Sequence, residues 1–280
     1  MDCDIIGFQE VFSRKALRHL VKELGFKYFK VVDIAKLSKN NPFKYVSTTV
    51  AIASKYPLID MQAVDVHIPS IKAHHFEGRF RFSRIPIKAT ITLPNDKELL
   101  VYVCHLKSNR NSEFEYVFNE THNLEHKKAL VFKALEHKYS ESLKQRLCEA
   151  SSLFFDIEKS KDMPTALLCD LNDKEYSITI DALSNPKYHD STSKDKNLVL
   201  RDAHYLYTPE VYNPHPEAKE PKRKATSYFL GKGNVLDYIF VSNHFSVTDY
   251  AILDAHLEEN KDGSLLQSDH AQVICELTLN

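Results

Sequence analysis

Short apolar runs separated by polar turns make up most of the chain, and their alternation is typical of β-strands. The pattern predicts strands over residues 4–11, 28–33, 48–54, 57–67, 85–93, 99–106, 164–171, 226–230, 235–242, 247–253 and 272–277. The segment Pro94-Asn95-Asp96-Lys97 has turn composition and predicts a hairpin between 85–93 and 99–106. Strands therefore outnumber helices, and many neighbouring strands are expected to be antiparallel.

Helical spacing occurs in fewer places. Ser13 can cap a helix that Gly25 closes, and residues 141–159 repeat apolar side chains at three- and four-residue intervals. A short helix is expected over 174–183, and the prolines of 208–224 predict a loop. No repeat or linker interrupts the pattern, which indicates stacked sheets flanked by helices within one domain.

Composition narrows the class of protein. The 280 residues are 43% hydrophobic and 27% charged, which is usual for a globular chain, and the net charge of −1 excludes a wholly basic nucleic-acid coat but permits a local basic patch. None of the five cysteines forms a CxxC pair, so we expect reduced thiols in a cytoplasmic protein. We also expect a monomer. No apolar run approaches the roughly 20 residues of a membrane span.

Polar side chains that can bind metal or move protons gather where the predicted strands end. They are Glu10, His105, Asp170, Asn172, Asp237, Asp269 and His270. Each alone has an ordinary explanation as a turn or surface residue. A charged side chain inside or beside an apolar strand is nevertheless costly unless it is paired or metal-bound, and so many of them in one chain indicate a shared site.

The residues of five short segments, and the order of these segments along the chain, resemble the pattern of a known family. Phe8-Gln9-Glu10-Val11, His105-Leu106-Lys107-Ser108, Cys169-Asp170-Leu171-Asn172-Asp173, Leu236-Asp237-Tyr238-Ile239 and Ser268-Asp269-His270 follow one another along nearly the whole chain. Together they resemble the endonuclease/exonuclease/phosphatase superfamily. The resemblance implies an α/β fold, a four-layer α/β sandwich in which two mostly antiparallel sheets pack face to face with helices outside. It also implies a metal-dependent phosphoesterase.

The resemblance assigns expected roles to the acidic and amide side chains. Glu10 and Asp269 would hold Mg²⁺, or Mn²⁺, because hard divalent cations are bound by carboxylates and water. Asp170 would orient or deprotonate the attacking water, and Asn172 would hold water or phosphate.

The resemblance also assigns roles to the two histidines. His270 would contact the scissile phosphate, held in orientation by Asp237 as an acid holds a histidine in a protease triad. His105 would donate a hydrogen bond to a phosphate oxygen.

Two features depart from the family pattern. Family members usually begin with an earlier strand that ends in a metal-binding Asn, whereas this sequence starts at about the second strand. We therefore expect a single, N-terminally shortened domain over residues 1–280 with one metal ligand fewer. Cys169 also stands where the family usually has Gly before the catalytic Asp.

Local charge bears on the substrate. Residues 66–110 hold eight Lys or Arg against three acids, and Arg84, Lys107 and Arg110 are the predicted phosphate contacts. The leading hypothesis is a phosphodiesterase, a nuclease acting on DNA or RNA by direct attack of water. Two alternatives stay open: a phosphomonoesterase or lipid/inositol phosphatase of the same fold, and a catalytically weakened binding module.

Overall fold

The computed structural model describes residues 3–110, 112–190, 192–194, 197–207, 223–229, 232–257 and 268–280. Its strands are β1 (Ile5–Val11), β2 (Tyr28–Lys30), β3 (Thr49–Ser54), β4 (Leu58–Ala63), β5 (Ile87–Thr92), β6 (Glu98–His105), β7 (Thr165–Asp170), β8 (Arg201–Asp202), β9 (Ser227–Phe229), β10 (Lys232–Asn234), β11 (Asp237–Val241), β12 (Phe245–Leu253) and β13 (Gln272–Leu279). Its helices are α1 (Arg14–Glu23), α2 (Ile68–Ala73), α3 (Leu124–Glu136), α4 (Glu141–Glu158), α5 (Ile178–Ser184), α6 (Pro186–His189) and α7 (Ala203–Leu206). The predicted 208–224 loop, apart from its last two residues, lies outside the described residues.

A six-stranded sheet in the order β4-β5-β6-β7-β11-β8 forms the centre of the fold. Its ladders are antiparallel except for the parallel pair of β6 and β7. Both faces of β6 are buried. Tyr102 packs toward the helices, whereas Val101 and Val103 pack toward the other sheet layer. Burial on both faces explains why this strand is an almost unbroken apolar run.

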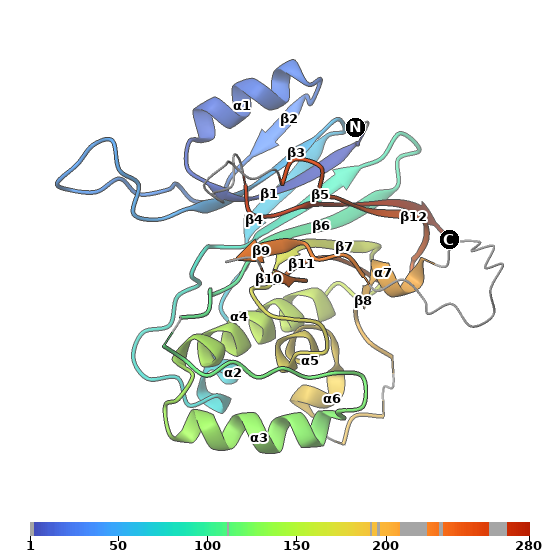
Figure 1. The fold of residues 1–280 in the computed structure, drawn as a ribbon. Coiled ribbons are helices and arrows are strands. Elements are labelled where there is room, and N and C mark those ends of the chain that lie inside the picture. Colours follow the sequence, from blue (N-terminus) through green and yellow to red (C-terminus); the bar gives the residue numbers. More distant parts are fainter. Residues whose placement is uncertain are drawn as a thin grey trace.

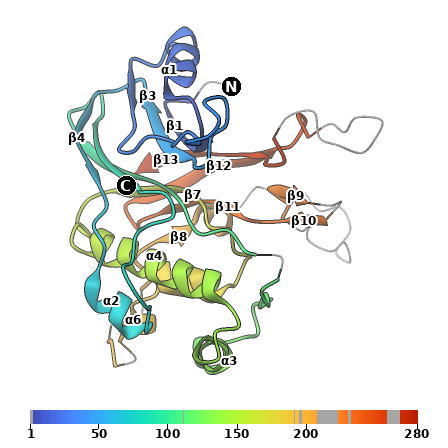
Figure 2. The same cartoon turned by 90° about the vertical axis from the view of Figure 1, so that its left-hand side faces the viewer.

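A second sheet layer covers one face of the six-stranded sheet (Figures 1 and 2). Val50 and Ile52 of β3 enter the same apolar cluster as Val101, and Val247 of β12 and Val273 of β13 pack against it. Within the described residues, hydrogen bonds join this layer as two separate ladders, β1-β3-β2 and β12-β13. The site residues of β1 and of the segment before β13 therefore reach the central sheet from the same side.

Helices form the two outer layers. α3, α4 and α5 cover the far face of the six-stranded sheet through Val131, Leu147 and Ala182, among others. α1 lies over the opposite side, where Val21 packs against Ala51 and its neighbours. Ser13 accepts a hydrogen bond from the Ala16 N–H and caps α1 as predicted. The four-layer α/β sandwich is confirmed.

Several predicted elements differ from those observed. The strand expected over 57–67 ends at Ala63, and the helix α2 begins at Ile68, where Pro69 suits the first turn. The helix α3 was not predicted. The strand predicted over 235–242 begins two residues later than expected, because Asp237 is the first residue of β11. Among the described residues, no helix is long and apolar enough to cross a membrane.

Candidate active site

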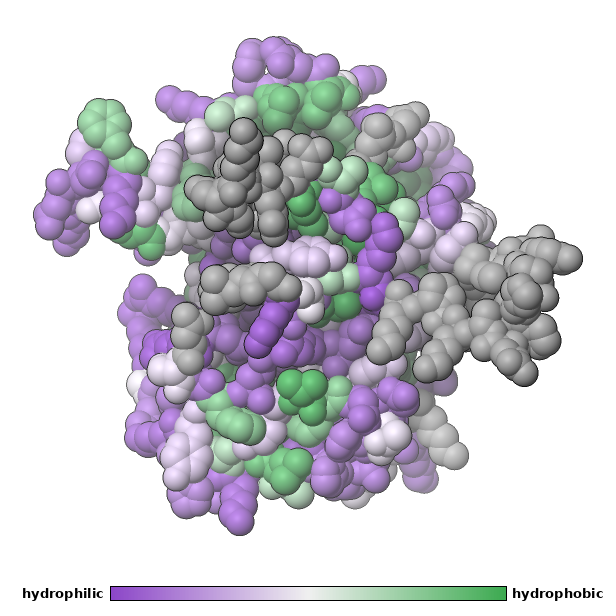
Figure 3. Space-filling view, viewed as in Figure 1, coloured by the Kyte–Doolittle hydropathy of each residue, from purple (hydrophilic) through white to green (hydrophobic). Residues whose placement is uncertain are grey.

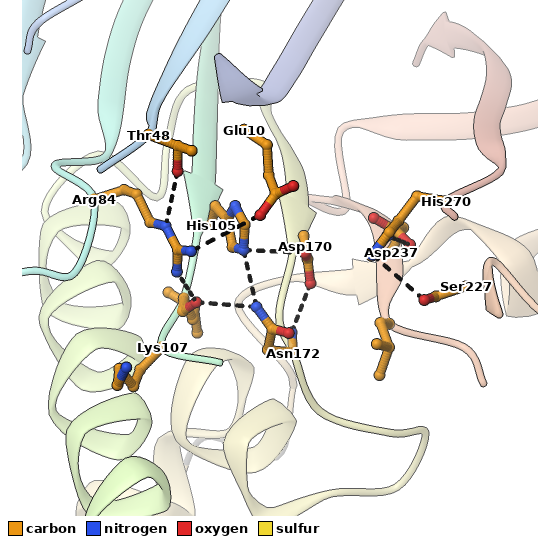
Figure 4. A network of polar contacts seen from close by, with 12 residues as sticks. Glu10, Thr48, Arg84, His105, Lys107, Asp170, Asn172, Ser227, Asp237 and His270 are labelled. Atoms are coloured by element: carbon orange, nitrogen blue, oxygen red, sulfur yellow. Dashed lines mark hydrogen bonds and ion pairs between the residues drawn. The ribbon is translucent and has the colours of Figure 1, made fainter. Parts of the chain in front are cut away.

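Three predicted site residues lie side by side because of the register of three adjacent strands. His105 ends β6 and pairs with Asp170, which ends the parallel strand β7. Asp170 in turn pairs with Asp237, which begins the antiparallel strand β11. The carboxyl ends of β6 and β7 and the amino end of β11 thus meet at one edge of the sheet, and Figure 4 shows their side chains converging there.

His105 is a neutral, buried imidazole in this cluster. Its Nε2 lies 3.1 Å from Asp170 Oδ2 and 2.9 Å from Asn172 Nδ2. Burial, then the charges of Arg84 and His270, lower the pKa of His105 well below its usual range. Its Nδ1 is buried and has no hydrogen-bond partner among the described residues. A neutral ring can donate to a phosphate oxygen without adding a fixed charge.

Asn172 closes the turn after β7. Its backbone is left-handed, with a φ of 50°, a conformation that Asn tolerates better than most residues. Its N–H donates to Asp170 Oδ1 at 2.8 Å, and its Nδ2 donates to the Leu106 carbonyl at 3.1 Å. The turn therefore fixes Asp170 from one side and ties it to the segment that follows His105.

The carboxyl group of Asp170 has a pKa raised close to neutral pH. Burial, then the neighbouring charge of Asp237, raise its pKa to about 7, although His270, the Asn172 N–H and Arg84 act in the opposite direction. A carboxylate whose pKa lies near the working pH is well suited to accept a proton.

His270 and Asp237 form a hydrogen-bonded pair. His270 Nδ1 lies 2.8 Å from Asp237 Oδ2, and its Nε2 lies 3.4 Å from Ser227 Oγ. Burial by itself lowers the pKa of His270, but the hydrogen bond to Asp237 and the Asp237 charge outweigh it and raise the pKa to about 9. The imidazole is therefore cationic at neutral pH.

Glu10 and Asp269, the predicted metal ligands, come from β1 and from the residue before His270, and neither belongs to the close group of ligand-type side chains described below. Glu10 sits where the register of β1 and β3 shifts, with a left-handed φ of 53°, and Figure 4 shows it pointing toward His105. Asp269 directly precedes His270, whose pKa its charge helps to raise.

Among the described residues, one group of ligand-type side chains is close enough to share a metal ion. It consists of Asp170, Asp237 and His270, whose ligand atoms lie within 4.8 Å of one another. This concentration of carboxylates fits a hard divalent cation, which would relieve the repulsion that raises the Asp170 pKa. The assignment of Glu10 and Asp269 as ligands stays a prediction.

Arg84 is the cation that faces these carboxylates. Its Nη1 donates to the Leu106 carbonyl at 3.0 Å, its Nε donates to Thr48 Oγ1 at 3.3 Å, and its Nη2 lies 4.0 Å from Glu10 Oε1. The guanidinium is thus held in place from three sides. It lines, with Lys107, an open cleft of about 510 Å³.

Lys107 is held by two buried residues of α4. Its N–H donates to Glu149 Oε2 at 2.7 Å, and its carbonyl accepts from Arg146 Nη1 at 3.1 Å. Glu149 also accepts from the N–H of Ser83 at 2.6 Å, next to Arg84. One carboxylate therefore ties together the two segments that carry the cleft cations. We call this set of contacts the α4 clamp.

Arg110 differs from the other two predicted phosphate contacts. Its side chain is 63% exposed and lies 3.9 Å from Glu113 Oε1. Burial, and then the nearby charge of Arg110, lower the pKa of the Lys107 amine, but Arg110 does not line the cleft. Its role as a phosphate contact stays a prediction.

Three residues that shape the site, Thr48, Arg146 and Glu149, were not among the predicted site residues. Thr48 carries no sequence signal, since a threonine before a strand is ordinary. Arg146 and Glu149 adjoin the apolar stripe of the predicted 141–159 helix, yet both are buried, at 2% and 1% exposure. A charged pair beside an apolar stripe is the signal that could have indicated a buried role.

Comparison with known families decides how this geometry is classified. The sequence model of the endonuclease/exonuclease/phosphatase family matches residues 1–270. The chain belongs to the endonuclease/exonuclease/phosphatase family. Members of this family act on phosphate esters, in agreement with the predicted phosphoesterase class. No curated protein matches the sequence.

Solved structures support the fold assignment. The human Nocturnin catalytic domain with bound sulfate has a TM-score of 0.58 at 14% identity, with 99% of this chain and 81% of that chain covered. D. rerio TDP2 complexed with single-strand DNA product has a TM-score of 0.53 at 11% identity, covering 98% and 86%. A mannosyl-6-phosphatase from Bacteroides thetaiotaomicron has a TM-score of 0.52 at 17% identity, covering 99% and 85%. At these identities the likeness concerns the fold.

Proposed function

We propose that the chain is a divalent-metal-dependent phosphodiesterase, a single domain over residues 1–280 that cleaves DNA or RNA by direct attack of water. One observation carries the proposal. One edge of the sheet, beside an open cleft, brings together the buried base Asp170, the neutral His105, the hydrogen-bonded pair of His270 and Asp237, and the cation Arg84.

Asp170 acts on the water. With a pKa of about 7 it is partly ionised at neutral pH, and it accepts a proton as the water oxygen forms its bond to phosphorus and the ester P–O bond breaks. Asn172, whose amide lies at the same edge, holds the water or a phosphate oxygen. No covalent enzyme intermediate forms.

The histidines act on the phosphate. Asp237 fixes the ring of His270 and keeps it protonated, so that a positive charge faces the oxygens on which negative charge develops. His105 stays neutral, and its Nε2–H, which lies 3.1 Å from Asp170 Oδ2 without substrate, would donate to a phosphate oxygen when substrate is bound.

Glu10 and Asp269 would hold the metal, Mg²⁺ or Mn²⁺. When bound, the ion supplies positive charge at the phosphate oxygens and lowers the pKa of bound water. The residues fit this role because oxygen ligands predominate at this edge of the sheet, where the carboxylates of Asp170 and Asp237 are paired in register.

The substrate class follows from the cleft. Arg84 and Lys107 line an open groove, in which a phosphodiester backbone can lie with its phosphate against both cations. The TDP2 structure of the same fold holds a single-strand DNA product, which makes nucleic acid the first substrate to test.

Hydrolysis assays test this proposal. We expect the protein to hydrolyse bis-p-nitrophenyl phosphate and to nick plasmid DNA with Mg²⁺ or Mn²⁺, and to lose both activities in chelator. His270→Ala should lower turnover by orders of magnitude, whereas His19→Ala, at an exposed position on α1, should not. Hydrolysis confined to p-nitrophenyl phosphate would instead indicate a phosphomonoesterase. The absence of any hydrolysis would favour the binding module.

A further inference from the structure

A hairpin beside the cleft carries chemistry that the proposed reaction does not use. Residues 34–47, which we call the basic hairpin, form a short antiparallel ladder: Leu37 bridges Tyr45, the Ser38 N–H donates to the Lys44 carbonyl at 2.7 Å, and the Val46 N–H donates to the Lys36 carbonyl at 2.8 Å. In Figure 1 it projects from the body of the molecule, and Figure 3 shows a hydrophobic group at its end among hydrophilic ones. Its ladder gives it a defined shape.

The basic hairpin exposes apolar and cationic side chains together. Phe43 is 94% exposed and Val46 61%. Its three lysines, Lys36, Lys39 and Lys44, are exposed, and the sequence has no acidic residue from 34 to 59. Large exposed apolar groups are costly in water, and their combination with unopposed positive charge points to an anionic partner that has apolar surfaces.

The base of the hairpin forms part of the cleft wall. The ring of Tyr45 lies 5.6 Å from that of Phe12, with an interplanar angle of 54°, and both rings line the cleft with Arg84 and Lys107. Phe12 follows Glu10 by two residues, and Thr48, just beyond the hairpin, accepts the hydrogen bond from Arg84. The aromatic pair is therefore continuous with the groups that would hold the scissile phosphate.

We infer that Phe12, Tyr45 and the basic hairpin form a platform for single-stranded nucleic acid, on which bases stack while the lysines contact flanking phosphates. The inference deepens the proposed function and rests on it for the position of the scissile phosphate. Unpaired bases offer their faces to aromatic rings, whereas the bases of a duplex stack on each other. A bilayer could reach the exposed tip at Phe43 but not rings that line a cleft, so the aromatic pair favours a strand over a membrane.

Binding measured in chelator tests the inference separately from catalysis. The probe is a fluorescein-labelled oligothymidylate of about 12 nucleotides, within the usual site size, followed by fluorescence anisotropy. Phe12→Ala and Tyr45→Ala should each weaken binding between about 5-fold and 150-fold, the loss of one stacked base. Tyr139→Ala, an exposed aromatic that does not line the cleft, should bind like the wild type.

The lysines are tested by the salt dependence. Lys39→Gln and Lys44→Gln should each reduce the slope of log Kd against log salt by about 0.7, the value for one phosphate contact to a single strand. Lys22→Gln on α1 is the matched control and should leave the slope unchanged.

Three results would overturn the inference. The first is a wild-type Kd in folded Phe12→Ala and Tyr45→Ala variants, and the second is equal affinity of the wild type for a duplex. The third is binding to phosphatidylcholine–phosphatidylserine vesicles that Phe43→Ala abolishes, together with single-strand binding that neither ring substitution weakens. Circular dichroism establishes folding. A wild type that binds the strand but hydrolyses no ester would defeat the proposed function alone. One that hydrolyses bis-p-nitrophenyl phosphate without binding the strand would defeat the inference alone.

Discussion

Glu149→Gln is the substitution that tests the α4 clamp most sharply. The wild-type carboxylate accepts the N–H of Ser83 at 2.6 Å and that of Lys107 at 2.7 Å. A glutamine keeps one carbonyl oxygen and turns an NH₂ group toward the other N–H. One buried donor then has no acceptor, which costs about 1–3 kcal/mol.

We expect two measurable consequences. The free energy of unfolding in urea should fall by about 1–3 kcal/mol. The KM for a phosphodiester should rise on the order of tenfold, equivalent to about 1.4 kcal/mol, because Lys107 and the segment beside Arg84 are no longer held in register with the phosphate. The kcat should change less, since neither residue touches the attacking water.

Steady-state kinetics at a temperature where the variant is folded separate these effects. Glu158→Gln, an exposed acid on the same helix, is the control and should match the wild type in both KM and stability. A folded Glu149→Gln variant with an unchanged KM would refute the role assigned to the clamp, because a purely structural role affects stability alone.

Three further predictions follow from the same structure. Asp237→Asn should lower kcat on the order of a thousandfold, because the ring of His270 loses the acid that fixes it; a near-normal kcat would remove Asp237 from the site. Glu10→Gln should raise the Mg²⁺ concentration needed for half-maximal activity, and an unchanged requirement would exclude it as a ligand. Burial lowers the pKa of His189 to about 4, so stability should be full above pH 6.5 and fall by roughly 3 kcal/mol toward pH 4. His189→Gln should reduce this loss of stability, measured as the free energy of unfolding in urea at each pH. An unaltered pH profile in the variant would contradict burial of His189 as the cause of the loss.

The sheets were predictable because their strands carry clear apolar runs. The β5–β6 hairpin and β7 occur where the pattern placed them. The helix α2 was not predicted because its six residues are too few to establish a period, and it directly follows a strand-like run. The start of β11 was displaced because Val235 and Leu236 are apolar, although the ladder begins only at Asp237.

The candidate site was predictable in its residues but not in its arrangement. Nothing local indicates that β7 lies between β6 and β11, and this order is what brings His105, Asp170 and Asp237 together. The α4 clamp depends on a helix about 40 residues from Lys107 in sequence, so its contacts arise only from tertiary packing. The left-handed backbone at Glu10 comes from a bulge that the strand pattern does not reveal.

Turnover of bis-p-nitrophenyl phosphate by Asp170→Asn in saturating Mg²⁺ tests the central claim most directly. The amide keeps the size of the side chain but cannot accept the proton of the attacking water. We predict a folded protein whose kcat falls at least about a hundredfold, the low end of the contribution of a general base. A kcat equal to that of the wild type would contradict the assignment of this strand edge as the place where water attacks phosphorus.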